Sequence, residues 1–324
     1  MNWTLPCFLA ANSCFIDKFK TGGVGNTLWS VTDAGTLNQP GSYTYDGNGN
    51  VKTDTRNGIT GITYNMLNLP SSVTRTAGNI NYIYDAAGSK LRKTGTETRE
   101  YIDGIEYSGT AVAFISNEEG RAVPNGAAAY SYDYYLKDHL GNTRAAIKQD
   151  GSIVQVQDYY AFGQSYNPGN AYSPSPDNCY KYNGNEMQET GQYDYSARFY
   201  DPVIGRWNGI DPLAEVSRMF SPFTYGMNNP IRMIDPNGMI TYDPITGTYK
   251  NEDGSPASKP DIAEYISETA TTVYQRGSGN STDDLPFHRV KLGSQFYSYI
   301  GNGKYKLWYD GIKPDYTFES IYWR

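Results

Sequence analysis

The sequence predicts a mainly β protein, in which an antiparallel sheet of tyrosine-rich repeats precedes a small α+β C-terminal domain. Three observations lead to this fold class. Tyrosine, which favours pleated and half-buried surfaces, occurs 31 times against 11 phenylalanines. Glycine, which serves tight turns, occurs 34 times. A tyrosine-containing segment also recurs at a nearly constant spacing, which is typical of a repeat architecture.

Three clear copies of the repeat lie in the first third of the chain. They read YTYDGNGNVKT, ITYNMLNLPSSV and NYIYDAAGSKLRK, and a fourth, degenerate copy, REYIDGIEYSG, begins at Arg99. The key tyrosines of the three clear copies are Tyr45, Tyr64 and Tyr84, which follow one another at an almost even interval. We expect each copy to form a strand, a turn and a returning strand.

The residues of one copy have separate structural roles. A Tyr-x-Tyr pair places two rings on the same face of a strand, and the Asp or Asn after the second Tyr can bond its own backbone and begin a turn. Gly-Asn or Asn-Gly supplies the positive φ of a tight turn. Because a single hairpin is only marginally stable, the copies are expected to stack into one continuing sheet. The tyrosine stripe is therefore expected to serve packing, although the same face also suits sugars.

The N-terminal segment, 1–40, is expected to be a leader or a degenerate stretch of the chain. Its apolar run has no positive residue before it, so it is a poor signal peptide. The formal net charge of −7 gives no electrostatic reason to expect binding to DNA or anionic membranes. No run of about 18 apolar residues exists to span a bilayer. Cys7, Cys14 and Cys179 suit neither zinc nor a disulfide framework, and no cofactor or metal is expected.

Three longer motifs follow the repeats. They are YYLKDHLGNTRAAI (Tyr134–Ile147), DYYAFGQSY (Asp158–Tyr166) and YKYNGNEMQETGQYDYSARFYDPVIGRWNGIDPLAE (Tyr180–Glu215). Together with the YD dipeptides, these motifs resemble the RHS/YD-repeat proteins and their RHS repeat-associated core. The resemblance covers roughly residues 41–239, with YD repeats over 41–130 and the core over 131–239. It implies that the strands form part of a hollow β-shell, which the core closes at one end.

The resemblance also implies a site for self-cleavage. In this family the core resembles an aspartyl-protease-like site that cuts its own chain after an Asp-Pro-x-Gly turn. In this sequence, SARFYDP supplies Arg198, GRWNGIDPLAE supplies Asp211 and NPIRMIDPNGM supplies Asp235. The scissile bond would join Met239 to Ile240, with Met where family members often have Leu.

The residue types suit this chemistry independently of the resemblance. Two carboxylates within a few ångströms share one proton, so the charged one can activate water while the protonated one polarises the scissile carbonyl. The alternative is that Asp-Pro merely starts turns, as also at Asp201 and Asp243. Arg206 and Arg232 are alternative partners or structural salt bridges. The DHLGNTR motif, which contains His139, is expected to be a strand and turn of the sheet.

The composition changes after Met239. Residues 240–260 are rich in Gly, Pro, Ser and Asp, and are expected to be a linker with a small hairpin. From Asp261, apolar residues at helical spacing predict a helix. The runs FHRVKL, QFYSYI, KYKLWY and YTFESIYW predict antiparallel strands after it. Residues 240–324 are therefore expected to be a variable C-terminal domain, with its helix and strands in 261–324.

A helix followed by strands is also the outline of several small ribonuclease toxins. The candidate residues in this tail are His288, Arg289, Lys291 and Arg276, because a histidine base and basic phosphate clamps suit RNA cleavage. Against a nuclease, the tail holds nine Lys and Arg but eleven Asp and Glu. Another toxin and an inert tail remain the alternatives.

The sequence leaves two classes of function. The first is a β-shell core that encloses its own C-terminal tail as cargo and releases it by self-cleavage, in competition between bacteria. This class implies an immunity protein and a secretion apparatus as partners, a longer shell segment that completes the part-shell, and a location outside the bacterium or on its surface. The second class is a non-enzymatic remnant or a cell-surface interaction protein with an inert tail.

Overall fold

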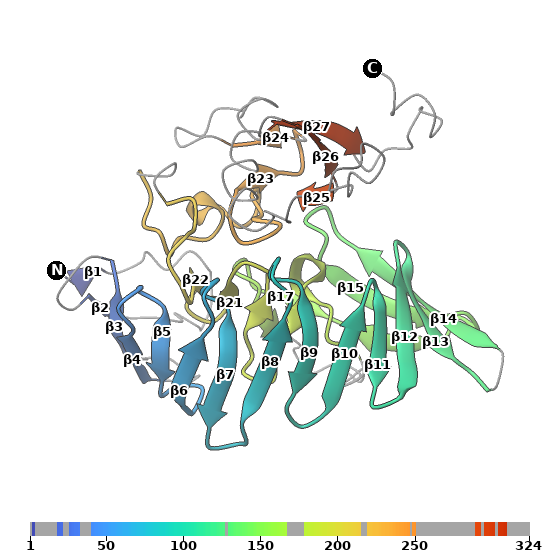
Figure 1. Cartoon of the computed structure of the whole chain (residues 1–324), viewed down its shortest axis with the longest axis horizontal. Coiled ribbons are helices and arrows are strands. Elements are labelled where there is room, and N and C mark those ends of the chain that lie inside the picture. Colours follow the sequence, from blue (N-terminus) through green and yellow to red (C-terminus); the bar gives the residue numbers. More distant parts are fainter. Residues whose placement is uncertain are drawn as a thin grey trace, which may run out of the picture.

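One antiparallel sheet of 16 strands dominates the computed structural model of the chain (Figure 1). The strands follow one another across the sheet in sequence order, from β1 to β16. The structure describes residues 2–3, 18–21, 26–32, 40–126, 129–166, 178–214, 219–246, 248–250, 289–292, 295–301 and 304–309, and their side chains between residues 26 and 250. A mainly β fold with a long antiparallel sheet is therefore confirmed.

The strands of this sheet are short, and from β4 to β13 they are joined by tight turns, as strand–turn–strand repeats require. They are β1 (Asn2–Trp3), β2 (Lys18–Thr21), β3 (Leu28–Thr32), β4 (Gly41–Tyr45), β5 (Val51–Asp54), β6 (Ile59–Tyr64), β7 (Pro70–Arg75), β8 (Ile80–Tyr84), β9 (Lys90–Thr94), β10 (Thr98–Ile102), β11 (Ile105–Ser108), β12 (Ala111–Asn117), β13 (Gly120–Pro124), β14 (Tyr130–Lys137), β15 (Thr143–Lys148) and β16 (Ile153–Val156). The first three lie in the segment expected to be a leader, and they extend the sheet beyond the repeats.

The turn of each repeat is closed by the side chain that follows its key tyrosine. The Asp46 carboxylate accepts hydrogen bonds from the N–H groups of Asn48 and Asn50, each at 2.9 Å. Asn65 and Asp85 accept the equivalent pair of bonds from the residues two and four positions after them. The predicted turn-forming role of the Asp or Asn in each repeat is confirmed.

The two faces of the sheet carry different side chains. Tyr43 and Tyr82 are buried on the inner face, and the key tyrosines of the repeats pack half-buried beside them. The outer face of the repeats carries polar side chains, as where the hydroxyls of Thr44 and Thr53 lie 2.6 Å apart on neighbouring strands, together with exposed apolar ones such as Ile83. Because the rings occupy the packed inner face, the prediction that the tyrosine stripe serves packing is confirmed.

The DHLGNTR motif forms the turn that follows β14 and the start of β15. The Asp138 carboxylate accepts bonds from the N–H groups of Leu140 at 3.0 Å and Asn142 at 3.1 Å, as in the repeats. His139 is exposed, and its Nε2 lies 3.2 Å from the Ile231 carbonyl oxygen. The structural interpretation of this motif is confirmed.

The core that follows the sheet is made of short elements around an aromatic cluster. The elements are β17 (Asp158–Tyr159), β18 (Ser165–Tyr166), η1 (Tyr182–Gly184), β19 (Glu186–Met187), β20 (Tyr193–Asp194), β21 (Phe199–Asp201), β22 (Arg206–Trp207) and η2 (Gly226–Asn228). The cluster consists of Tyr182, Tyr193, Tyr195, Tyr200, Trp207 and Tyr225, each at most 2% exposed. Rings packed edge to face in this way fix the backbone of β20, β21 and β22.

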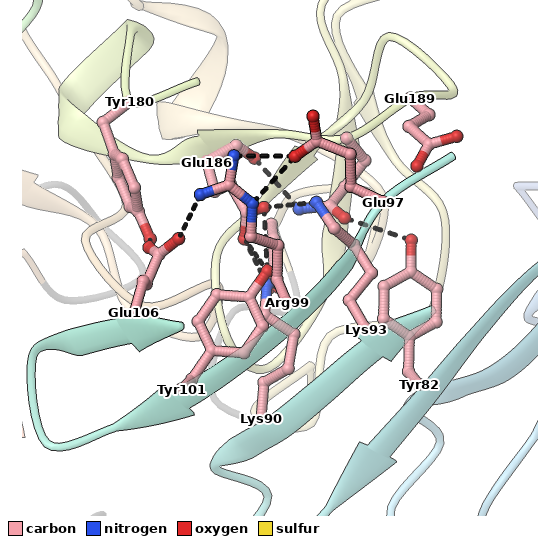
Figure 2. Close-up of polar contacts among 12 residues, drawn as sticks. Tyr82, Lys90, Lys93, Glu97, Arg99, Tyr101, Glu106, Tyr180, Glu186 and Glu189 are labelled. Carbon is pink, nitrogen blue, oxygen red and sulfur yellow. Dashed lines mark hydrogen bonds and ion pairs between the residues drawn. The ribbon is translucent and has the colours of Figure 1, made fainter. Parts of the chain in front are cut away.

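A buried ionic network joins the core to the inner face of the sheet (Figure 2). Glu186 on β19 accepts hydrogen bonds from Lys90 at 2.5 Å and Lys93 at 2.6 Å on β9, and from Tyr101 on β10 at 3.0 Å. Lys90 also donates to Asp194 on β20 at 2.6 Å. Burial alone would raise the pKa of Glu186, but the two lysines outweigh it and lower the pKa to about 2. The ion pairs of this network therefore hold β19 and β20 against the sheet.

Two smaller sheets follow the core. β23 (Tyr242–Asp243) and β24 (Thr248–Tyr249) form a hairpin, and β25 (Arg289–Leu292), β26 (Gln295–Gly301) and β27 (Lys304–Tyr309) form an antiparallel sheet. The strands of the second sheet fall in three of the four runs that predict strands in the tail. The helix predicted from Asp261 and the last predicted strand lie outside the described residues.

Candidate active site

Three separate turns of the core bring Arg198, Asp211 and Asp235 together. Arg198 directly precedes β21, in the stretch between two strands that the aromatic cluster fixes. Asp211 begins a turn after β22, in which its Oδ1 accepts the N–H of Leu213 at 2.8 Å. Asp235 begins the DPNG turn, where Gly238 has a φ of +78°, a conformation that side chains with a Cβ rarely adopt.

The Arg198 guanidinium lies between the two carboxylates. Its Nη2 is 2.8 Å from Asp211 Oδ2 and 3.3 Å from Asp235 Oδ2. Its Nε donates to the Gly238 carbonyl oxygen at 2.5 Å. Because one nitrogen contacts both carboxylates, the predicted trio occupies a single site, and its Arg198 side chain is only 3% exposed.

Two further contacts of Arg198 were not predicted from the sequence. Its Nη1 donates to the Pro222 carbonyl oxygen at 3.0 Å, and its guanidinium lies 4.2 Å from the centroid of the Trp207 ring. A cation over an aromatic face is attracted by the ring, which restrains the side chain in this position. Trp207 belongs to the same motif as Asp211, and this shared motif is the signal that could have found it. A backbone carbonyl such as that of Pro222 gives no signal in a sequence.

The Asp235 carboxylate lies against the predicted scissile peptide. Its Oδ1 accepts hydrogen bonds from the N–H of Met239 at 2.9 Å and from the N–H of Ile240 at 3.2 Å. Ile240 is only 9% exposed, so the bond between these residues is shielded from bulk water. The group best placed to exchange a proton with the Ile240 nitrogen is therefore Asp235.

Burial raises the pKa of both carboxyl groups. It raises the pKa of Asp235 to about 6, with Arg198 opposing the rise and Asp211 adding to it. Burial also raises the pKa of Asp211, against the opposing effect of Arg198. Asp211 is nearer to the guanidinium, and its side chain is 13% exposed against 4% for Asp235. The pair therefore favours a shared state with the proton on Asp235 and the charge on Asp211.

A small cavity adjoins the carboxyl pair and the peptide bond. Its volume is about 30 Å³, and Asp211, Asp235, Met239 and Ile240 are among the residues that line it. A water needs roughly 10–15 Å³ of such space and two to four polar partners, so the cavity can hold a water beside the pair. A larger cavity of about 230 Å³ lies against Asp211 and Arg198 and is also lined by the turns of the first two repeats.

The raised pKa of Asp235 predicts a pH-dependent gain of stability in Asp235→Asn. A carboxyl group with a raised folded-state pKa contributes stability below pH 4, and this contribution is lost as the pH rises through about 6. The asparagine cannot ionise, so we expect the variant to gain up to about 3 kcal/mol at pH 7 and nothing near pH 4. Denaturant unfolding at both pH values measures this. An equal effect at both would contradict the raised pKa.

The other candidate residues lie away from this trio. Arg206 donates to the Asn26 carbonyl oxygen at 2.6 Å, and Arg232 pairs with Asp243 at 2.9 Å. Of the tail candidates, Arg289 and Lys291 are on β25 with undescribed side chains, and His288 and Arg276 lie outside the described residues. The alternative partners for the carboxyl pair therefore make structural contacts elsewhere.

The described stretches hold neither a metal site nor a membrane-spanning helix. No group of three or more His, Cys, Asp or Glu residues there is placed to hold a metal ion. In the same stretches, no helix has the length and apolar character needed to cross a membrane.

Comparison with known proteins found no matching family model. Salivary gland surface protein 1 of Aedes aegypti is 41% identical over 164 residues, which are 49% of this chain and 4% of that protein. The tRNA(Glu)-specific nuclease WapA of Bacillus subtilis subsp. natto is 27% identical over 252 residues, which are 72% of this chain and 10% of the nuclease.

A similar fold occurs in a solved structure of the Photorhabdus luminescens Tc holotoxin pore. It aligns with a TM-score of 0.51 and 18% identity, over 65% of this chain and 12% of the toxin chain. The present chain thus spans only a small part of the length of each protein that it matches. Its YD turns, its long antiparallel sheet and these sequence similarities support the resemblance of the chain to RHS/YD-repeat proteins and to RHS-type toxins.

Proposed function

We propose that this chain cuts its own backbone between Met239 and Ile240, which separates a C-terminal fragment, 240–324, from the sheet and core. One observation carries the proposal. Asp235 accepts hydrogen bonds from the N–H groups on both sides of that bond, and it shares Arg198 with Asp211 beside a water-sized cavity. A base, an acid, the peptide and room for water thus adjoin one another.

In this proposal each carboxyl group has its own role. Charged Asp211 takes a proton from water, whose oxygen adds to the Met239 carbonyl carbon. Protonated Asp235, with its oxygen 3.2 Å from the Ile240 nitrogen, gives its proton to that nitrogen as the C–N bond breaks. The products are a carboxylate on Met239 and an amino group on Ile240. The reaction consumes one water and requires no cofactor.

Arg198 is a positioning residue as well as a charge partner. Its bond to the Gly238 carbonyl oxygen fixes the residue that precedes Met239, and its Nη2 holds both carboxyl groups. Because Arg198 holds the peptide bond close to both carboxyl groups, the attack of water on that bond becomes effectively intramolecular. Such positioning is a large source of rate acceleration.

The fragment released in this way is proposed to be an effector. The resemblance to RHS toxins and the match to a tRNA nuclease support a toxin cargo in residues 240–324, used in competition between bacteria. An immunity protein, a secretion route and a longer shell segment belong to the same proposal. The proteins of similar sequence are much longer than this chain, which supports the need for further shell strands.

The wild-type chain tests the proposal directly. After expression and folding, mass measurement under denaturing conditions should show a fragment with the mass of 240–324, and N-terminal sequencing should begin at Ile240. A single intact chain in freshly purified, folded protein would overturn the proposal. A fragment that begins at another residue would show that the cleaved bond is not the one beside Asp235.

The rate of cleavage should depend on the proton of Asp235. Because the pKa of Asp235 is raised to about 6, we expect cleavage to slow as the pH rises through that value and the acid loses its proton. Following the fragment over time from pH 4.5 to pH 8 measures this. A rate that increases steadily to pH 8 would contradict the role of Asp235 as an acid.

A second candidate is an interaction role without cleavage. β14 exposes Tyr130, Tyr132, Tyr134 and Leu136 on the face opposite to its buried Asp133. Exposed aromatic side chains on a sheet are typical of binding surfaces, and one relative is a salivary gland surface protein. An intact chain in the mass experiment would favour this candidate.

A further inference from the structure

The segment that follows the proposed scissile bond is itself bonded to the core. We call residues 240–246 and 248–250 the clip. The clip contains the β23–β24 hairpin, and it pairs with the strand-like segment that precedes the DPNG turn. Ile234 N–H donates to the Tyr242 carbonyl oxygen at 2.9 Å, and Tyr242 N–H donates back to Ile234 at 2.7 Å. Both partners of this bridge remain after the bond between Met239 and Ile240 is cut.

A buried carboxylate of the clip makes a second connection across the bond. Asp243, whose side chain is fully buried, accepts hydrogen bonds from Arg232 Nε at 3.1 Å and Nη2 at 2.9 Å. Lys250 of the clip lies 3.5 Å from the same carboxylate, and the N–H groups of Ile245 and Thr246 also donate to it. Arg232 belongs to the core side of the bond, so this ion pair joins the two products.

The charge of Asp243 is stable over a wide pH range. Burial alone would raise its pKa, but the hydrogen bonds from Arg232 and from Thr246 and Ile245 outweigh it and lower the pKa to about 2. The connection to Arg232 is therefore present at every pH at which the protein would be handled. Both Arg232 nitrogens donate to the same carboxylate oxygen, Oδ2, and charge-assisted hydrogen bonds of this kind are among the stronger polar contacts in proteins.

Hydrolysis would add a third connection. In the intact chain, the Ile240 nitrogen is an amide 3.2 Å from Asp235 Oδ1. After cleavage the same nitrogen is a terminal amine, whose ordinary pKa of about 8 makes it an ammonium at neutral pH. An ammonium facing a carboxylate in a nearly closed site forms a charge-assisted hydrogen bond, which is stronger than the amide contact that it replaces.

We propose that the clip is a docking segment that keeps the C-terminal fragment bound to the core after cleavage, through the Tyr242 bridge, the Arg232–Asp243 pair and the new Ile240 ammonium. This inference rests on the proposed self-cleavage. The clip consists of the fragment's own first residues. Its partner is the core segment that carries Ile234, Asp235 and Arg232. While the clip is bound, its ammonium occupies Asp235, so the site is closed to a second peptide.

The test compares Asp243→Asn with a matched control. The full chain is immobilised through its N-terminus, allowed to cleave, and washed at pH 7 while the fragment in the wash is measured. We expect wild type to retain the fragment and Asp243→Asn to release it on the order of tenfold faster or more, because a charge-assisted bond across the cut is weakened. Asp150→Asn removes an exposed carboxylate that accepts a hydrogen bond from Ser152 within its own turn, and it should behave as wild type.

Two results would contradict the proposed role of the clip as a docking segment. One is immediate loss of the fragment from wild type, and the other is equal release from wild type and Asp243→Asn. Arg232→Gln is a second variant that removes the same ion pair, in case Asp243→Asn misfolds. The Arg232 side chain is 48% exposed, and this substitution leaves the clip sequence unchanged. It should also accelerate release.

Failure of cleavage gives a different result from failure of the clip. If the chain stays intact, the proposed self-cleavage is overturned, and hydrogen exchange then tests the clip in the uncut protein. The Ile234 and Tyr242 amides should be protected in wild type and should exchange at least tenfold faster in Asp243→Asn, in line with the loss of about one charged hydrogen bond. Unprotected amides in the wild-type chain would overturn the clip by themselves.

Discussion

Asp235→Asn is expected to leave the chain as a single intact polypeptide under conditions in which wild type yields the C-terminal fragment. The asparagine oxygen can still accept the N–H groups of Met239 and Ile240, but the side chain has no acidic proton to give to the leaving nitrogen. Loss of a positioned general acid typically lowers a rate by roughly 100-fold or more. Denaturing mass measurement of freshly folded protein, followed over time, measures the loss.

Asp211→Asn should abolish the proposed cleavage for a different reason, since it removes the proposed base that activates water. Asp150→Asn is the matched control, because it makes the same substitution at an exposed turn and should cleave at the wild-type rate. The expected stability of Asp235→Asn at pH 7 separates lost chemistry from lost folding. Cleavage at the wild-type rate in both Asp211→Asn and Asp235→Asn would contradict the assigned roles.

Glu186→Gln, in the buried network that joins the core to the sheet, is expected to lower the free energy of unfolding strongly. It removes the carboxylate that pairs with Lys93 and Lys90, and the buried Lys93 ammonium loses its charged partner within the described part of the chain. Breaking one side of a buried ion pair typically costs about 3–5 kcal/mol. Denaturant unfolding at pH 7 measures the free energy of unfolding.

The control for this change is Glu100→Gln, in which the same substitution is made at a partly exposed pair with Arg92. We expect its effect to be below about 1 kcal/mol, because water screens exposed pairs. The lowered pKa of Glu186 means that its contribution is present above its ordinary range and is lost as the pH falls towards about 2. Equal effects of the two substitutions at pH 7 would show that the network is not what holds the core to the sheet.

Much of the fold could be predicted because its information is local and repeated. The spacing of Tyr45, Tyr64 and Tyr84 predicts strands of similar length, and the Asp or Asn that follows each one accepts the turn N–H groups as expected. Such bonds join residues two to four positions apart, so a sequence displays both partners together. The same rule predicted the turn around His139.

The candidate site could be predicted only as a set of motifs. Arg198, Asp211 and Asp235 were named from a family resemblance, and spacing alone gave no reason for them to meet. Their contacts join residues 13 and 37 positions apart, on three separate turns around the aromatic cluster. Trp207 was missed because its contact with Arg198 depends on that packing.

The antiparallel sheet, its turn chemistry and the change of composition after Met239 could all be read from the order of the residues, because each depends on near neighbours and on the two-residue period of a strand. Three contacts emerged only from the folded chain: the carboxylates that share Arg198, the meeting of Glu186 with Lys93 across 93 positions, and the return of Asp243 to Arg232. The contact of Glu186 with Lys93 depends on how the core packs on the inner face of the sheet, and the other two depend on how separate turns of the core and the clip meet. Packing follows from side-chain shape and burial in three dimensions, which residue spacing does not record.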